Sequence, residues 1–201
     1  MTTLDSKVAF LHVIDDHRWL AASGCIWNLV GPNGATGTKK DVDRLLPNCD
    51  VMARDCLLVH ARSLIKFYRN SSRRSTDIIL SDFGVPAVDV SLSDRLESFE
   101  YSIEVHLLHL TDWRDSDYRR LNATGRDAKR DRVDWDRDAT LIVDLIFIAL
   151  NHVSGHPGAW QRPFKDLLDA TSARYWDASF AWPANLGEKT EVEHYLTDLG
   201  L

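Results

Sequence analysis

The chain has 201 residues, 44% of them hydrophobic, and its 24 basic and 30 acidic side chains give a formal net charge of −6. This length and apolar content are sufficient for one large domain with its own core. The acidic balance excludes a protein that holds nucleic acid over a broad basic surface. It still allows a local site for a transient nucleic-acid substrate.

The cysteines and the apolar runs indicate the compartment. Cys25, Cys49 and Cys56 form neither an even set nor a C-x-x-C spacing, so we expect reduced thiols. The first residues lack the basic and apolar pattern of a secretion signal. The longest apolar stretch, 139–150, falls short of the roughly 20 residues that cross a bilayer. We therefore expect a cytoplasmic protein with no membrane partner.

Apolar residues at helical spacing predict helices in the first half of the chain. A first helix, or a broken pair, covers 4–30 and ends at a glycine- and proline-rich stretch over 31–37. A second helix covers 51–70, with an apolar face wide enough to lie between neighbours. The following segment, 77–86, has apolar residues that require burial. We expect it to be a structured loop, with a short strand as the alternative.

The second half continues the helical pattern. A helix with apolar residues from Leu92 to Trp113 has Ser91 or Ser93 as its N-cap. The segment 115–138 is dominated by charges and is expected to be solvated. Further helices are predicted over 137–153, 163–173 and 188–199, with an aromatic stretch between the last two.

These elements together predict an all-α fold, an up-and-down helical bundle with an extra C-terminal helical segment. We expect residues 1–155 to form the bundle. Residues 156–201 would form a helical and aromatic extension that packs on it.

Two predicted helices combine histidine with arginine inside otherwise apolar stretches. Histidine titrates near neutral pH and arginine stays charged, so the two can move a proton and hold a phosphate. Arg54 and His60 stand six positions apart, which places them about 120° apart around one helix. A joint site would therefore require a bend or a second subunit.

The order of motifs over residues 54–114 is more specific. A helix with the pattern H-x-R-x-L-x-x-F begins at His60, D-x-x-x-x-D-F follows at Asp77, and H-L-L-H-L-T-D-W-R begins at His106. Together with the Arg54 to His60 spacing, this order resembles the branch of the HEPN superfamily found in abortive-infection systems and in related uncharacterised bacterial proteins.

The resemblance implies a helical bundle, a homodimer, and metal-independent RNA cleavage in a toxin or phage-defence role, with an antitoxin as a further partner. It implies no cofactor and no metal ligand. In such a reaction a histidine transfers protons to or from the reacting oxygens, and an arginine stabilises the charge on the phosphate. The candidates are His60 and His109 for the first role and Arg54, Arg62 and Arg114 for the second.

A structural interpretation of the same residues competes with catalysis. A neutral histidine inside an apolar helix commonly bonds a carboxylate and ties helices together. Asp77 or Asp82 would be that carboxylate for His60, and Arg62 would pair with the other. In this alternative the protein is a non-catalytic interaction or dimerisation protein, and its polar residues form a buried network.

A metal site is a third, weaker hypothesis. Three side chains recur every three positions and share a helix face: His106, His109 and Asp112. They would be ligands in a metal site, whereas His106 and Asp112 would be supporting residues in the nuclease site. The pattern lacks a further ligand and the H-E-x-x-H motif.

The N-terminal histidines are weaker candidates for a functional site. His12 and His17 point about 140° apart on a helix, so we expect their segment to be a solvated face.

Overall fold

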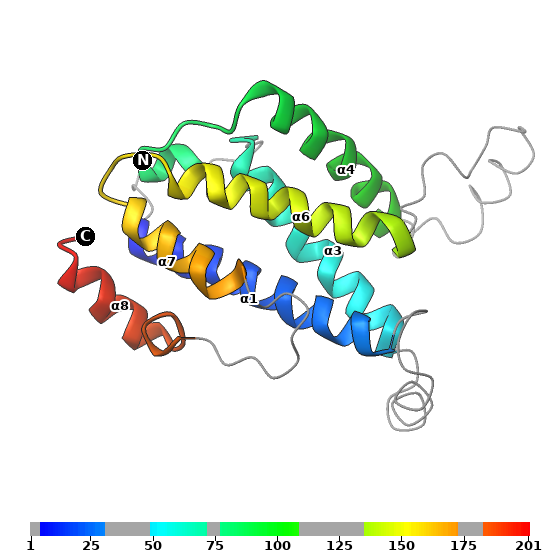
Figure 1. Cartoon of the computed structure of the whole chain (residues 1–201), viewed down its shortest axis with the longest axis horizontal. Coiled ribbons are helices and arrows are strands. Elements are labelled where there is room, and N and C mark those ends of the chain that lie inside the picture. Colours follow the sequence, from blue (N-terminus) through cyan, green and yellow to red (C-terminus); the bar gives the residue numbers. More distant parts are fainter. Residues whose placement is uncertain (1–4, 31–48, 72–76, 109–134, 173–182) are drawn as a thin grey trace, which may run out of the picture.

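The computed structural model describes residues 5–30, 49–71, 77–108, 135–172 and 183–201 (Figure 1). These residues contain six α-helices, two short 3₁₀ helices and no strand, which confirms the all-α class. The elements in chain order are α1 (Ser6–Val30), α3 (Cys49–Tyr68), η1 (Leu80–Phe83), α4 (Val90–Leu108), α6 (Trp135–Ser154), α7 (Gln161–Ser172), η2 (Ala184–Leu186) and α8 (Lys189–Asp198).

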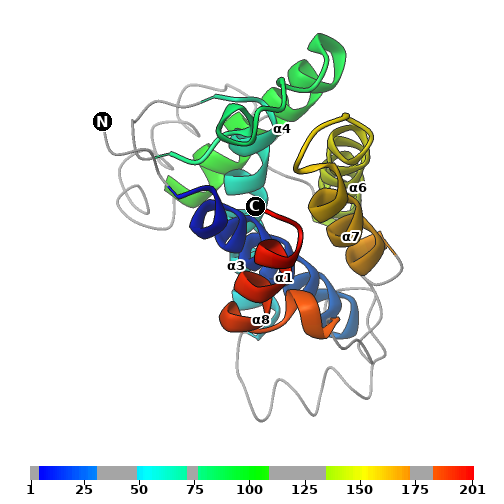
Figure 2. The same ribbon diagram turned by 90° about the vertical axis from the view of Figure 1, so that its left-hand side faces the viewer.

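The helices form a bundle in which successive helices run in alternating directions (Figure 1). α1 and α3 make the most extensive contact and lie side by side as an antiparallel pair. α3 is central because it also contacts α4 and α6. Figure 2 shows α6 and α7 together on one side of this pair, and α8 packs on α1.

The position of α3 follows from its apolar face. Two adjacent rows of its side chains are almost completely buried: Leu57, Leu58, Ala61, Leu64, Ile65 and Tyr68. Burying one such aliphatic side chain stabilises the fold by about 1.5–3 kcal/mol. The expectation that this helix lies between neighbours is therefore confirmed.

An aromatic cluster joins one end of the bundle to the segment that follows α3. Phe10 of α1, Phe67 of α3, Phe83 of η1 and Phe164 of α7 meet beside Trp160, with ring centroids 4.8 to 6.3 Å apart. Most of these pairs are edge-to-face, the arrangement that aromatic quadrupoles favour. The cluster holds the connector between α3 and α4 against α1 and α7.

That connector is the structured loop expected from the sequence. η1 ends at Gly84, whose φ of 69° is left-handed and favours glycine. The amide of Val85 donates to the Leu80 carbonyl at 3.2 Å, and the Ser81 amide donates to the Asn70 side chain at 3.1 Å. These bonds fix a compact turn.

The helix ends that can be compared agree with the sequence to within a few residues, except for one cap. The end of α4 that the sequence predicts near Trp113 lies outside the described residues. α4 begins at Val90, and the Asp89 carboxylate accepts the Leu92 amide at 2.9 Å. The expected caps, Ser91 and Ser93, lie inside the helix. Asp89 caps because it precedes the first helical turn, where free amides need an acceptor.

The C-terminal segment contributes to the same hydrophobic core as the bundle. Trp160, Phe164 and Leu167 are buried in it, as are Leu186 and Leu196. The aromatic stretch around Trp176 and Phe180 and most of the charged segment 115–138 lie outside the described residues. No helix in the described ranges is long and apolar enough to cross a membrane.

Candidate functional site

A histidine and an aspartate meet between the two most closely packed helices. His60 of α3 donates through Nδ1 to Oδ1 of Asp16 of α1 at 2.7 Å. Because an ionised carboxylate only accepts hydrogen bonds, this contact places the imidazole proton on Nδ1 and leaves Nε2 as the acceptor of the neutral ring. The two side chains remain 21% and 27% exposed, so the pair is accessible to a solute.

An exposed tryptophan stands against this pair. The indole of Trp19 lies nearly parallel to the His60 imidazole, with ring centroids 6.0 Å apart and an interplanar angle of 12°. Asp16 and Trp19 are three positions apart on α1, so both project from one face of the helix. The ring and the carboxylate together fix the orientation of His60.

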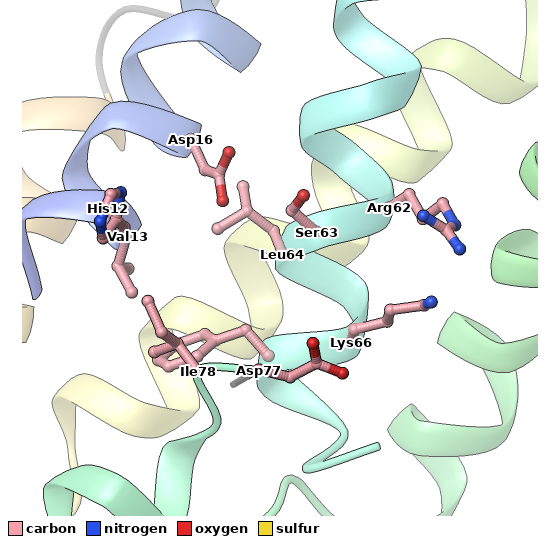
Figure 3. A pocket seen from close by; sticks show the side chains of 10 residues that line it. His12, Val13, Asp16, Arg62, Ser63, Leu64, Lys66, Asp77 and Ile78 are labelled. Carbon is pink, nitrogen blue, oxygen red and sulfur yellow. The ribbon is translucent and has the colours of Figure 1, made fainter. Parts of the chain in front are cut away.

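A cavity of about 450 Å³ opens on the Asp16 side of the pair, between α1, α3 and the start of the connector, and His60 is not among the residues that line it. The residues that line it are His12, Val13, Asp16, Arg62, Ser63, Leu64, Lys66, Phe67, Asp77 and Ile78. His12 precedes Asp16 by one helical turn and is exposed. In Figure 3, Asp16 and Ser63 lie between the two helices, while Arg62 and Lys66 point to the side of α3 away from α1.

Those cations belong to a charge ladder between α3 and α4, made of Arg62, Lys66, Arg69, Glu97, Glu100 and Glu104. Arg62 donates to one Glu104 oxygen through Nε at 3.1 Å and Nη2 at 2.7 Å. Lys66 lies 3.3 Å from the same oxygen, and Arg69 lies 2.7 Å from Glu97 and also bonds Glu100. The ladder ties the two helices together.

The electrostatics of Glu104 reflect this pairing. Burial favours the neutral acid and raises the pKa of its carboxyl, but hydrogen bonds from Arg62 and Lys66 outweigh that effect and lower the pKa below its usual value. The Arg62 guanidinium therefore has a structural contact, and the positive charge that it and Lys66 offer to the cavity is partly neutralised.

The remaining predicted residues are dispersed or outside the described ranges. Arg54 bonds the adjacent Asp55 at 3.2 Å. Asp82 accepts the Ile79 amide at 2.9 Å and stabilises η1, and Asp77 lines the cavity. The carboxylate that holds His60 is thus Asp16, rather than Asp77 or Asp82.

The C-terminal half of the predicted site is not described. His106 is a residue of α4. Outside the described residues lie His109, Asp112 and Arg114. Within the described ranges, no group of three or more histidine, cysteine, aspartate or glutamate side chains is placed to hold a metal ion.

The sequence interpretation missed the contribution of α1, and it was wrong about His17. That side chain is fully buried, and its Nε2 lies 2.8 Å from the Tyr68 hydroxyl. Burial lowers the pKa of His17 to about 3, so the ring is neutral in the folded protein. The signal for Asp16 was available, because His12, Asp16 and Trp19 recur at intervals of four and three on one face.

Comparisons with known proteins add no assignment: no family model, no curated protein and no solved structure matches this chain.

Proposed function

We propose that the protein is a HEPN-like, metal-independent ribonuclease with a toxin or phage-defence role, and that His60 is its general base. One observation carries the proposal: the imidazole of His60 is oriented by the Asp16 carboxylate at 2.7 Å, yet remains partly exposed, and Asp16 itself lines a cavity of about 450 Å³. A buried structural histidine would have no surface left for a substrate. His17, in the same helix pair, is such a residue.

The reaction is an intramolecular transesterification of RNA. His60 Nε2 takes the proton of a 2′-hydroxyl, O2′ attacks the adjacent phosphorus, and the bond from phosphorus to O5′ breaks. The products are a 2′,3′-cyclic phosphate and a 5′-hydroxyl. Asp16 stabilises the imidazolium that forms, because its carboxylate already accepts the Nδ1 proton.

A second imidazole can supply the proton that the leaving oxygen needs. His12 is exposed, lines the cavity, and lies one turn from Asp16 on α1. His109 is the other candidate from the motif order. Arg62 is held by Glu104, and Arg54 bonds the adjacent Asp55. Arg54 and Arg114 stay candidates for stabilising the phosphate from the motif order alone.

A second candidate function is a non-catalytic interaction or dimerisation protein. The charge ladder favours it, because Arg62 of the motif is used to hold α4. In that case His60 and Asp16 only tie α1 to α3.

Incubation with mixed RNA in the presence of a chelator tests the two functions. We expect cleavage with cyclic phosphate ends, and a rate about 10²- to 10⁴-fold lower for His60→Ala, which is the usual contribution of general acid–base catalysis. His12→Ala and His109→Ala identify the proton donor. His194→Ala removes an exposed histidine of α8 and is the matched control, expected to keep the parent rate.

Two results would contradict the nuclease. One is the absence of RNA cleavage by the folded parent protein. The other is cleavage that His60→Ala retains in full.

A further inference from the structure

The exposed tryptophan beside His60 is the strongest feature that the proposed reaction does not use. Trp19 is 55% exposed although it is a large aromatic residue, and one face of its ring lies against the imidazole. Isolated apolar residues are common on protein surfaces, but an indole held parallel to a catalytic ring is a specific arrangement. The contact keeps the indole in one orientation.

Other large apolar side chains are exposed on the two helices that meet at Trp19 and His60. Ile26 follows it by seven positions on α1, and Met52 and Val59 are exposed on α3, which packs against α1. We refer to Trp19, Ile26, Met52 and Val59 as the apolar ledge. Val59 immediately precedes His60 in α3.

We propose that Trp19 is a stacking platform for an unpaired base of the substrate, and that the protein therefore acts on single-stranded RNA. This inference rests on the proposed nuclease function and defines its substrate class. A base of single-stranded RNA has a free π-face that an aromatic side chain can stack on, whereas the bases of a duplex are stacked on one another. Trp19 is 55% exposed, so a base can stack on the ring face that His60 does not cover.

The charge of the protein supports the same conclusion. With a net charge of −6, the chain gains little affinity from the phosphate backbone, and the cavity cations Arg62 and Lys66 are paired with Glu104. We therefore expect contacts with the bases to supply a larger share of the binding free energy than they do in proteins that bind mainly through phosphates. A measurable consequence is a weak dependence of the dissociation constant on salt, compared with proteins that bind mainly through phosphates.

The test measures binding separately from cleavage. The probe is a short, labelled 2′-O-methyl RNA, which has no free 2′-hydroxyl and cannot be cleaved by the proposed reaction. The dissociation constant is measured for the probe as a single strand and again for the probe in a duplex. The variants are Trp19→Ala, Trp19→Phe, and the control Tyr101→Ala, which removes another exposed aromatic side chain from α4.

We expect the single strand to bind more tightly than the duplex. Trp19→Ala should raise its dissociation constant about 5- to 100-fold, the range for loss of one stacked base, and Trp19→Phe should restore most of the affinity. Tyr101→Ala should bind like the parent. Circular dichroism of each variant verifies folding, and the parent's preference for the single strand over the duplex still tests the inference if the alanine variant is unfolded.

Three outcomes would overturn the inference. The parent could prefer the duplex, or fail to bind the single strand. Trp19→Ala could bind as tightly as the parent. Lastly, Trp19→Ala could change only the self-association of the protein in sedimentation experiments. That result would assign the apolar ledge to a contact with a second copy of this chain. Because the probe is not cleavable, its binding is measured independently of cleavage. A parent protein that binds the single-stranded probe but does not cleave RNA would count against the nuclease reaction and not against the platform.

Discussion

The buried histidine of α1 leads to a quantitative prediction about pH and stability. His17 is fully buried beside the Tyr68 hydroxyl, and burial lowers its pKa from 6.5 to about 3. Below pH 6.5 the unfolded chain therefore binds a proton that the folded protein does not bind. Acid stabilises the unfolded state, and the free energy of unfolding falls as the pH is lowered through 6.5.

The size of this effect follows from the two pKa values. At about pH 5 the folded-state pKa still lies well below the solution pH, so only the unfolded histidine is protonated. The difference of about 1.5 pH units, at about 1.4 kcal/mol per unit, predicts that His17 alone lowers the free energy of unfolding by about 2 kcal/mol relative to neutral pH. Glutamine at position 17 does not titrate in this range and keeps an amide that can bond Tyr68.

Urea denaturation of the parent and of His17→Gln at about pH 7.5 and about pH 5 measures the effect. We expect the loss of stability between the two pH values to be smaller in the variant by about 2 kcal/mol. An equal loss in both proteins would refute the reasoning. If His17→Gln does not fold, proton NMR of the parent provides the result, because the His17 ring should not titrate above pH 5.

Four further substitutions test the ion pairs, a buried hydrogen bond and one backbone conformation. Glu100→Gln should destabilise the fold by about 2 kcal/mol in urea titrations, because it removes the charge paired with the mostly buried Arg69. The control Glu193→Gln removes an exposed ion pair on α8 and should lower the free energy of unfolding by less than about 0.5 kcal/mol. Equal losses in the two variants would contradict the conclusion that the charge ladder stabilises the fold. Tyr68→Phe should cost about 1–2 kcal/mol, visible as a lower melting temperature, and an unchanged melting temperature would contradict the contact. Gly84→Ala should cost about 1 kcal/mol from its left-handed backbone alone, since no neighbouring atom would clash, so a neutral result would exclude that strain.

The helices could be predicted from the sequence because apolar periodicity is a local property. The row Ile142, Leu145, Ile146 and Ala149 repeats every three or four residues, and the structure buries all four in α6. Ile148, an apolar residue of the same helix, is on its exposed side. Composition indicated a core helix, but only the neighbours decide which face is buried.

The candidate site was harder to predict because its contacts are distant in sequence. Asp16 stands 44 positions before His60, and several carboxylates lie nearer in the chain, among them Asp77. Local patterns cannot choose between such partners. The charge ladder had a readable signal, since cations at 62, 66 and 69 and acids at 97, 100 and 104 share the helical period. Its pairing still depended on α4 lying antiparallel to α3.

Chemical rescue of His60→Ala by imidazole is the most direct test of the central claim, that the pair of His60 and Asp16 performs proton transfer on RNA. We predict that the parent cleaves single-stranded RNA in chelator, that His60→Ala is slower by about 10²-fold or more, and that added imidazole restores part of the lost rate. Imidazole should leave the rate of the His194→Ala control unchanged. An active parent whose His60→Ala variant keeps its rate, or a folded parent with no cleavage, would contradict the account.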